Sequence, residues 1–419
     1  MKVLVIGAGG REHALVKSLS NEETEMYCIP GNGGISRDAL VSDVPIHPPF
    51  KELIDFIRRE KIDLVIVGPE KPLVEGIVDY LEKQSIPVLG PSQNAAQLEG
   101  SKLFAKNFMK KHHIPTAEFK CFTEIEKAQD YLTHCSFPLV IKADGLAAGK
   151  GVIICSSMKQ ALLVLEDMLV KNIFAMSHPR VVIEEYLEGK ELSVIALTDG
   201  DAIIMFPPSR DHKRAGDNDT GPNTGGMGAF SSDDLLPPDL EDTIKQKILI
   251  PTVKGMKEEG TPYRGILYAG LMLTRKGPYV IEYNCRFGDP ETQALLPRIS
   301  EGLLPIFLQA CEGNLVSRRV RTTVHPSLCV ILASGGYPGR YETGMTIYGL
   351  ESIDDPNVTV FHSGTRIQDG TFYTAGGRVL GVTAVEESLK ECREKVYENI
   401  QKISFKAMHY RADIGKEGG

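Results

Sequence analysis

Short apolar runs alternate with amphipathic segments through the first hundred residues. The runs that predict buried strands are Lys2–Gly7, Glu25–Ile29, Leu64–Val67 and Val88–Leu89. The segments Arg11–Leu19 and Leu73–Lys83 carry apolar residues with a helical period of about 3.6 residues. Strands that alternate with helices in this way predict an α/β unit with an open, mainly parallel, Rossmann-like sheet.

The predicted strands of this unit end in loops rich in glycine or proline. These loops are Gly7–Gly10, Pro30–Gly34, Gly68–Glu70 and Gly90–Ser92. Ligands of open parallel sheets bind beyond the carboxyl ends of the strands, and loop amides favour anions, so the loops predict a site for a small phosphorylated ligand. The Gly7-x-Gly9 spacing is also typical of dinucleotide-binding folds, but Glu12 stands where a third glycine is needed and no acidic residue follows the second strand. Nicotinamide binding is therefore the weaker alternative.

From about residue 120 to residue 195, the pattern predicts a small α+β unit that contains a glycine-rich hairpin. The hairpin, Val140–Ile154, reads VIKADGLAAGKGVII. It is not a Walker A loop, because Asp144 replaces the first glycine, Gly151 replaces the Ser or Thr after the lysine, and a strand follows in place of a helix. Such a hairpin can lie over phosphates with its N–H groups turned toward them, and Lys142 can reach the same phosphates. An ordinary glycine-rich turn is the alternative.

Two further predicted strands, Val181–Leu187 and Glu191–Leu197, flank a short turn in the same unit. A strand, a hinge and a return strand can present backbone N–H and C=O groups to the edge of an adenine, with Glu191 placed to accept from ribose hydroxyls. Because Glu and Lys are mostly exposed residues, a charged surface hairpin is the alternative. A larger α+β body is predicted over residues 198–320, with another glycine-rich loop at Gly221–Gly228.

The most informative local pattern is Val280–Glu291, which reads VIEYNCRFGDPE. Side chains of a strand alternate between its faces, so Glu282, Asn284 and Arg286 are predicted to share one face. A carboxylate and an amide carbonyl suit Mg²⁺, which prefers oxygen ligands and keeps waters and substrate phosphates in its shell. The Arg286 guanidinium, one step along, can bind a phosphate or a carboxylate. A solvated polar strand face is the alternative, and the preceding segment Gly265–Thr274 offers no carboxylate as a third ligand.

Length, composition and charge limit the class of protein. The chain has 419 residues, too many for one core, so about two to four domains are expected. Residues 325–419 are strand-rich and close on a predicted helix, Ala384–Ile403. A net charge of −8 without a long Lys/Arg run argues against nucleic acid as the main partner, and no apolar run is long enough to span a bilayer. Eight cysteines without a C-x-x-C pair argue against a zinc site and suggest a reducing, cytoplasmic location.

The glycine-rich flap, the adenine-type hinge and the metal strand occur in the order typical of ATP-grasp enzymes. Beyond that superfamily, the sequence resembles the phosphoribosylamine–glycine ligase family of purine biosynthesis from end to end. The motifs that carry the resemblance are VIGAGGREHAL, GPEKPLVEGI, GPSQNAAQLEGSK, FPLVIKADGLAAGKGV, EEYLEGKELSV, SRDHKR, TGPNTGGMGA, EYNCRFGDPETQ, SGGYPG and TAGGRVLGVTA. Lys71 and Ser363 depart from the small residue and the alanine expected there, and neither is a proposed catalytic group.

The resemblance implies a multidomain α/β and α+β architecture. It places a phosphoribosylamine-binding domain at 1–103, an ATP-grasp domain at 104–324 with a mobile flap subdomain at about 120–195, and a small β-rich C-terminal domain at 325–419. The family couples glycine to 5-phosphoribosylamine with ATP, through glycyl phosphate, and releases glycinamide ribonucleotide, ADP and phosphate. The implied partners are these small molecules, with no nucleic acid and no membrane, in a monomer or weak homodimer.

The resemblance also implies the roles of individual residues, with Mg²⁺ (or Mn²⁺) beside ATP. The metal ligands would be Glu282 and Asn284. The nucleotide contacts would be Lys102, Lys142, Gly145, Gly149, Lys150, Gly151, Glu184, Glu185, Leu187 and Glu191. The substrate contacts would be Gly9, Gly10, Asn32, Gly33, Glu70, Asp211, Lys213 and Arg286. Lys142 and Arg286 would be catalytic, with Arg286 on the transferred phosphate or the glycine carboxylate.

Three other functions are alternatives at this level. The first is another ATP-grasp ligase or carboxylase of purine metabolism, which the acceptor loops at 30–34, 68–70 and 211–228 would distinguish. The second is a nicotinamide-dependent dehydrogenase, against which Glu12 counts. The third is a non-catalytic nucleotide-binding regulator, which an intact set of metal-strand residues disfavours.

Overall fold

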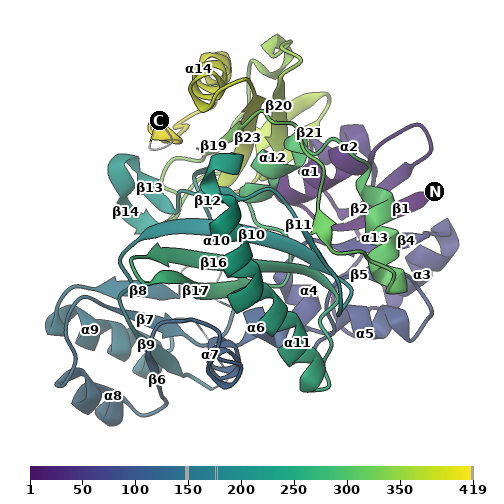
Figure 1. Ribbon diagram of the computed structural model, residues 1–419. Helices are drawn as coiled ribbons and strands as arrows, with labels where there is room; N and C mark the ends of the chain where they lie inside the picture. The colour runs from purple at the N-terminus through teal and green to yellow at the C-terminus, as the bar shows by residue number, and fades with distance from the viewer. Residues whose placement is uncertain (147–150, 175, 177, 417–419) are drawn as a thin grey trace.

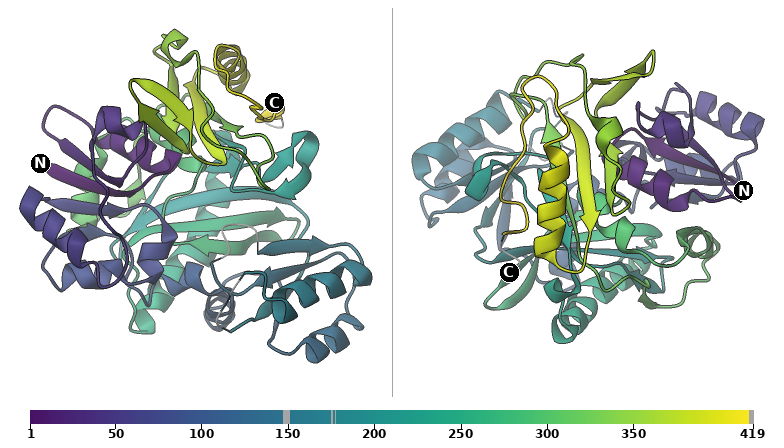
Figure 2. Two further views of the ribbon diagram at one scale, coloured as in Figure 1. Left: turned by 180° about the vertical axis from the view of Figure 1, so that it is seen from behind. Right: turned by 90° about the horizontal axis from the view of Figure 1, so that it is seen from above.

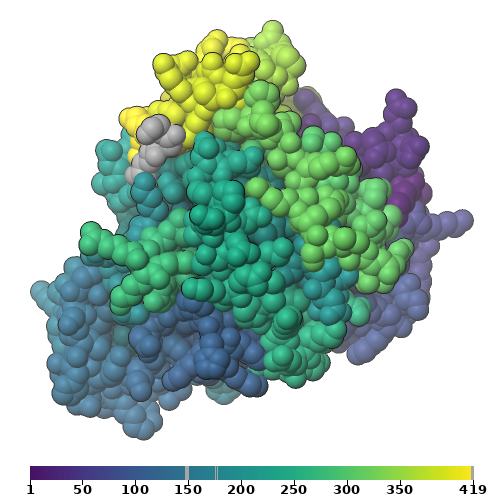
Figure 3. Space-filling model, viewed as in Figure 1, coloured from purple at the N-terminus to yellow at the C-terminus, as the bar shows by residue number. Residues whose placement is uncertain are grey.

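The computed structural model describes residues 1–146, 151–174, 176 and 178–416. A central antiparallel sheet occupies the middle of the molecule, with the N-terminal domain and the flap on opposite sides of it (Figures 1 and 2). The C-terminal strands and the last helix lie together at the top of Figure 1. In the space-filling view the flap projects from the lower left of the body (Figure 3).

The N-terminal domain is a five-stranded parallel sheet in the order β3-β2-β1-β4-β5, which confirms the open sheet predicted from the sequence. Its elements are β1 (Lys2–Gly7), α1 (Gly10–Leu19), β2 (Glu25–Pro30), α2 (Ile35–Asp38), β3 (Leu40–Val41), α3 (Lys51–Glu60), β4 (Leu64–Val67), α4 (Glu70–Val74), α5 (Ile77–Glu82) and β5 (Val88–Leu89). The single helix predicted at Leu73–Lys83 is wrong, because Gly76 adopts a left-handed φ of +87° between α4 and α5.

The flap is a four-stranded antiparallel sheet in the order β6-β9-β7-β8, packed against two helices that also contact each other. Its elements are β6 (Phe119–Phe122), α8 (Ile125–Leu132), β7 (Leu139–Ala143), β8 (Val152–Cys155), α9 (Met158–Leu165) and β9 (Val181–Glu185). The flap has a separate apolar core, because its buried side chains cluster among themselves. Two helices precede it: α6 (Gln97–Gly100) and α7 (Lys102–Lys111).

The central sheet runs in the order β17-β16-β10-β12-β15-β19-β23-β20, with β11 and β18 attached beside β10. Its elements before residue 320, with the hairpin and helices around them, are β10 (Lys190–Thr198), β11 (Ile203–Met205), β12 (Ser209–Asp211), β13 (Arg214–Gly216), β14 (Thr220–Asn223), β15 (Gly228–Ser231), α10 (Pro238–Ile244), α11 (Ile250–Glu258), β16 (Gly265–Thr274), β17 (Gly277–Asn284), α12 (Glu291–Leu295), α13 (Leu303–Glu312) and β18 (Arg318–Arg319). The predicted metal strand, β17, lies at the end of this order and carries the contact with the flap. It ends at Asn284, so Arg286 lies in the following loop, although burial still alternates through Phe287.

The C-terminal strands continue the central sheet, because β15 pairs with β19. One sheet therefore crosses residue 324, and the predicted domain boundaries stay a prediction. The elements are β19 (Ser327–Ala333), β20 (Val358–His362), β21 (Thr365–Gln368), β22 (Thr371–Thr374), β23 (Arg378–Val385) and α14 (Leu389–Ile400). The helix predicted at Ala384–Ile403 starts too early, because the β-branched end of β23 is a buried strand and Ser388 caps α14 by accepting from the Glu391 N–H.

Candidate active site

The face of β17 that the sequence singled out is turned away from the core. Glu282 and Asn284 lie on it, whereas Tyr283 and Cys285 point into the apolar interior and are each 2% exposed. Gly270 on β16 lies opposite Glu282, and a Cβ there would approach Glu282 Cγ to 3.3 Å. Within the described ranges, no three His, Cys, Asp or Glu side chains are grouped to hold a metal. The free face of β17 itself offers a cation two side-chain oxygen donors, the Glu282 carboxylate and the Asn284 amide.

The charges of four predicted basic side chains act on the Glu282 carboxylate. Lys213 has the largest effect, with its ammonium 3.4 Å from Glu282 Oε1. Burial alone would raise the pKa of Glu282, whereas the positive charges of Lys142, Lys102 and Arg286 lower it further, as Lys213 does. Together these cations lower the pKa of Glu282 to about 2. The carboxylate is therefore ionised at neutral pH, as a ligand for a divalent cation must be.

Lys142 is fixed by one contact within the flap and one contact with β17. Its ammonium lies 2.9 Å from Glu184 Oε2 and donates to the Ile281 carbonyl at 3.0 Å. Lys142 is on β7 and Glu184 on the paired strand β9, where both side chains are almost fully buried. Lys106 on α7 also lies 2.9 Å from Glu184 Oε2. The other oxygen, Glu184 Oε1, is buried without a hydrogen-bond partner among the described residues.

The base of the glycine-rich hairpin is tied to the start of α7. Lys102 Nζ donates to the Gly145 carbonyl at 2.9 Å, and burial lowers the pKa of Lys102. Asp144 accepts from the Ser101 hydroxyl at 3.0 Å and pairs with Arg180 at 2.8 Å. On the outgoing side, the Gly151 carbonyl accepts from the Ala143 N–H at 2.8 Å. The predicted contacts at Gly149 and Lys150 lie outside the described residues.

The predicted adenine hinge follows β9. Glu185 is exposed, and its side chain accepts from the Glu118 N–H at 3.0 Å, so the carboxylate is turned toward the edge of the flap sheet. Leu187 is half-buried in the turn. Glu191, at the start of β10, lies 3.2 Å from Lys213 Nζ, which links the hinge to the metal strand.

Arg286 joins the N-terminal domain to β17. Its Nη2 lies 2.9 Å from Glu99 Oε1, and its Nε lies 3.3 Å from Glu70 Oε2. The other oxygen of Glu99 accepts from the Cys285 N–H at 2.7 Å. Burial alone would raise the pKa of Glu70, but Arg286 and then Arg11 outweigh it and lower that pKa. The structure thus brings together two residues predicted from distant motifs, Glu70 and Arg286.

Glu12 explains why the first glycine loop is not a dinucleotide site. Its Oε2 accepts from the Gly9 N–H at 2.6 Å, and its Oε1 pairs with Arg11 Nε. Its side chain also fills the space that Cβ atoms at Gly7 and Gly68 would need. An acidic side chain therefore occupies the N-terminus of α1, where a dinucleotide phosphate would bind.

The other predicted substrate loops abut the C-terminal strands. Asn32 donates to the carbonyls of Ala8 and His362, so its amide is used to join the domains. The Gly33 N–H donates to the Thr365 carbonyl at 3.0 Å. Gly10 is packed tightly, because a Cβ there would lie 2.5 Å from Gln293 Nε2.

Asp211 and Lys213 lie at and just after the end of β12. Burial and the nearby Glu291 carboxylate raise the pKa of Asp211, and its Oδ1 lies 2.7 Å from where a Cβ at Gly226 would be. For Lys213, burial alone would lower the pKa, but Glu191 and Glu282 outweigh it and raise the pKa. Lys213 therefore stays charged between the hinge and the metal strand.

Two buried residues of this site were not found from the sequence. Glu99 lies just before the Gly100-Ser101-Lys102 motif, and its side chain is only 8% exposed. Lys106 lies four residues after Lys102 on α7, a spacing that places both lysines on one helix face. That spacing was a usable signal for Lys106, whereas nothing in the local pattern indicates that Glu99 is buried.

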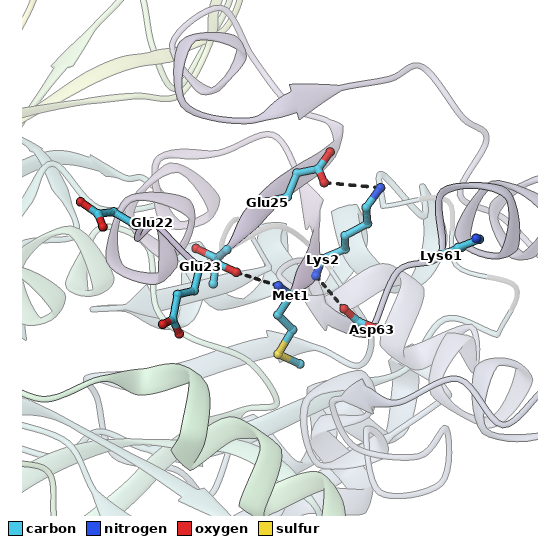
Figure 4. Close-up of a pocket in the computed structure, with 8 residues that line it drawn as sticks. Met1, Lys2, Glu22, Glu23, Glu25, Lys61 and Asp63 are labelled. Atoms are coloured by element: carbon cyan, nitrogen blue, oxygen red, sulfur yellow. Dashed lines mark hydrogen bonds and ion pairs between the residues drawn. The ribbon is translucent and has the colours of Figure 1, made fainter.

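A concavity of about 490 Å³ lies elsewhere, beside the N-terminus (Figure 4). Its ion pair and hydrogen bonds are exposed, with Lys2 paired to Glu25 and donating to Asp63. It lies at the amino ends of the parallel strands, whereas ligands of such sheets bind at the carboxyl ends. We therefore assign it no role in the site.

Comparisons with known proteins cover nearly the whole chain. Residues 1–99, 100–292 and 327–417 match the N domain, the ATP-grasp (A) domain and the C domain of phosphoribosylglycinamide synthetase. The phosphoribosylamine–glycine ligase of Escherichia coli (strain K12) is 47% identical over 420 residues, covering 99% of this chain and 98% of the relative. The crystal structure of the Thermotoga maritima phosphoribosylamine–glycine ligase has a TM-score of 0.87 at 34% identity, covering 99% of this chain and all of that one.

Likeness to other ATP-dependent enzymes is confined to the fold. The biotin carboxylase domain of the Hydrogenobacter thermophilus 2-oxoglutarate carboxylase, solved with MgADP and bicarbonate, has a TM-score of 0.75 at 16% identity, covering 98% of this chain and 91% of that one. The family-model matches and the Thermotoga maritima structure confirm the predicted arrangement of a parallel N-terminal sheet, an ATP-grasp core and a small C-terminal domain. On the full-length identity to its relatives, the chain belongs to the phosphoribosylglycinamide synthetase family, the ATP-grasp ligases that join glycine to 5-phosphoribosylamine.

Proposed function

We propose that the ligation of glycine to 5-phosphoribosylamine takes place at the free face of β17, beneath the flap. The observation that carries this assignment is the set of cations around Glu282: Lys213 lies 3.4 Å from its carboxylate and Lys142 donates to the neighbouring Ile281 carbonyl. The positive charges of Lys102 and Arg286 also act on Glu282. A triphosphate brings several negative charges, and phosphoryl transfer depends mostly on positioning and on charge neutralisation. This cluster of cations around one ionised carboxylate is the place in the chain best suited to a metal–nucleotide complex.

The nucleotide would lie between the flap sheet and β17. Lys142 has three N–H donors, and two of them go to Glu184 and Ile281, so one is left for a phosphate oxygen. The orphaned Glu184 Oε1 fits a donor such as the exocyclic amino group of adenine, because a buried carboxylate oxygen without a partner is costly. Lys102 would hold the hairpin over the phosphates through Gly145. Glu191 would accept from the ribose, and the backbone at Glu185 and Leu187 would meet the adenine.

Glu282 and Asn284 fit a magnesium site. One ionised carboxylate and one amide carbonyl are hard oxygen donors, and Mg²⁺ typically takes one or two protein ligands together with waters and phosphates. Mn²⁺ accepts the same donors. When bound, the ion would neutralise charge on the phosphates. Lys213 now lies against Glu282, so its ammonium would turn toward the substrates as the cation takes its place.

The reaction needs an activated carboxylate because hydroxide is a poor leaving group. The glycine carboxylate would attack the γ-phosphate of ATP and displace ADP. The phosphoribosylamine nitrogen would then attack the acyl carbon of glycyl phosphate, displace phosphate and lose a proton. Arg286 and Lys213 would bind the transferred phosphate or the glycine carboxylate, and their ion pairs with Glu99 and Glu282 at the edge of β17 support this proposal. Well-oriented reactants can reach effective molarities on the order of 10⁵ M, so holding both substrates here supplies much of the rate.

The acceptor would enter from the N-terminal domain. Gly9, Asn32 and Gly33 lie in loops at the carboxyl ends of β1 and β2, the usual binding edge of such a sheet. Gly10 and Glu70 are the first residues of α1 and α4, which follow β1 and β4 at the same edge. Glu70 reaches Arg286 directly, which supports a continuous path from these loops to β17. Asp211 would close the site from the other side.

Location and assembly are further parts of the proposal. Among the described residues, no helix is both long and apolar enough to cross a membrane. The cytoplasmic location and the monomeric or weakly dimeric state stay predictions, as does the mobility of the flap. Size-exclusion chromatography with light scattering over a concentration series would determine the assembly.

ADP release with each substrate omitted in turn tests the function. We expect ADP only when ATP, a divalent cation, glycine and phosphoribosylamine are all present, with formation of glycinamide ribonucleotide in equal amount. Glu282→Gln should abolish this turnover, whereas Glu258→Gln, an exposed carboxylate on α11, should leave it unchanged. Turnover with a different amino acid or acceptor, and none with this pair, would refute the assignment.

A further inference from the structure

We propose that Lys106 is a positioning residue for the triphosphate: by sharing the Glu184 carboxylate with Lys142, it keeps a net positive charge at the Lys142 ammonium. This inference rests on the proposed nucleotide site. Lys106 contacts no part of the free face of β17, and none of the roles described above uses it. Its side chain is nevertheless only 3% exposed, which is exceptional for a lysine on a helix.

The geometry joins three elements through one oxygen. Lys106 Nζ and Lys142 Nζ each lie 2.9 Å from Glu184 Oε2. Lys106 also donates to the Thr116 hydroxyl at 2.8 Å, and that hydroxyl donates to the Val280 carbonyl on β17 at 2.8 Å. The lysine thus holds the carboxylate from α7 while Thr116 links it to the strand beside the metal site.

The three charged groups that meet at Glu184 do not cancel. Two ammonium groups on one carboxylate leave the buried cluster with a net charge of +1, so the positive charge of Lys142 is only partly neutralised. Burial and the charge of Lys142 lower the pKa of Lys106 to about 8, which still leaves it protonated at pH 7. Without Lys106, Glu184 and Lys142 would form a neutral pair, and a buried neutral pair attracts phosphates weakly.

Lys106→Met is the direct test, because methionine keeps the length and apolar stem of lysine but not its charge. We expect the variant to bind MgATP about tenfold more weakly at pH 7, because one buried unit charge near the phosphates is lost. Its affinity for adenosine, which has no phosphate, should change less than twofold. Lys110→Met, at an exposed position on the same helix, is the matched control and should change neither affinity. Calorimetry gives both constants, and far-UV circular dichroism checks folding.

A second variant separates charge from packing. Lys106→Met combined with Glu184→Gln restores a net charge of +1 at Lys142, so we expect the ratio of MgATP to adenosine affinity to recover to within about threefold of the wild-type ratio. Equal losses of MgATP and adenosine affinity in Lys106→Met, or no recovery of the ratio in the double variant, would overturn the proposal.

Lys142→Met is measured alongside. If it leaves MgATP affinity unchanged, the nucleotide site itself is wrong and the role of Lys106 falls with it. If it weakens MgATP binding and Lys106→Met does not, only the role of Lys106 is refuted.

Discussion

Replacing Arg286 with methionine would leave two carboxylates without their cationic partner at the junction between the N-terminal domain and β17. The guanidinium lies 2.9 Å from Glu99 and 3.3 Å from Glu70. Breaking a buried ion pair by removing one partner typically costs about 3–5 kcal/mol. Glu99 is 8% exposed and bears the full penalty, whereas Glu70 is 28% exposed and can be partly hydrated, so we expect a loss of about 3 kcal/mol at pH 8.

The loss should depend on pH with a definite sign. Burial already raises the pKa of Glu99 above its ordinary value of 4.5, and removing Arg286 would raise it further. A carboxyl with a raised folded-state pKa holds its proton more tightly in the native protein, so stability falls as pH rises from about 4.5 through the folded-state value. Arg286→Met should therefore be closer to wild type at pH 5 than at pH 8. The chain contains no Trp, so urea unfolding is best followed by circular dichroism.

Adding Glu99→Gln separates stability from catalysis. The double variant removes the unpaired charge of Glu99, so its free energy of unfolding should be about 2 kcal/mol higher than that of Arg286→Met at pH 8. It should not recover turnover, because the guanidinium proposed to bind phosphate or glycine is still missing. Arg58→Met, an exposed arginine on α3 that donates to Gln84, is the control for loss of a surface cation. If the double variant were as unstable as the single one, or if Arg286→Met turned over at the wild-type rate, the reasoning would be refuted.

Three further changes test other parts of the structure. Lys213→Met should lower kcat about a hundredfold, the usual effect of removing one group that stabilises developing charge. Mn²⁺ binding to the enzyme–ADP complex, followed by electron paramagnetic resonance, should not weaken in this variant. A parallel loss of metal binding would contradict the proposal that the cation replaces the Lys213 ammonium at Glu282. Gly10→Ala should lower the free energy of unfolding by about 1–3 kcal/mol, because its Cβ would lie 2.5 Å from Gln293 Nε2, whereas Gly302→Ala meets only an ordinary contact at 3.6 Å and should be neutral in the same urea titration. For Asp38, burial alone would raise the pKa, but hydrogen bonds from His13 and Lys17 outweigh it and lower the pKa to about 2. The ionised carboxylate therefore stabilises the protein by about 2 kcal/mol above pH 4, and this stabilisation is lost as pH falls toward 2. Acid unfolding of Asp38→Asn should lack that part of the pH dependence.

The sequence predicted those features that depend on local pattern. Alternation along β17 placed Glu282 and Asn284 on one face and buried Tyr283, because a strand has a fixed period of two. The strands of the N-terminal sheet were also found, since buried parallel strands form continuous apolar runs. The errors fell where a single residue changes the backbone. Gly76 splits a helix that looks continuous, and Ser388 starts the last helix after a strand of similar apolar content.

Contacts between distant segments could not be predicted in this way. The pairing of Arg286 with Glu99 joins residues separated by nearly half the chain, and nothing near Glu99 indicates that it will be buried. The use of Asn32 to bridge Ala8 and His362 is a tertiary effect of the same kind. The glycine-rich hairpin predicted a phosphate contact for Lys142, and the resemblance to a family supplied the role of Lys102. The carboxylate of Glu184 shared by Lys106 and Lys142 became visible only in three dimensions.

A crystal structure with Mg²⁺ and a non-hydrolysable ATP analogue would test the central claim most directly. We expect a cation bound by Glu282 and Asn284, in contact with the phosphates, with the Lys142 ammonium on a phosphate oxygen and Lys213 displaced from Glu282. A triphosphate bound away from β17, or a cation with neither of these two residues in its shell, would contradict it.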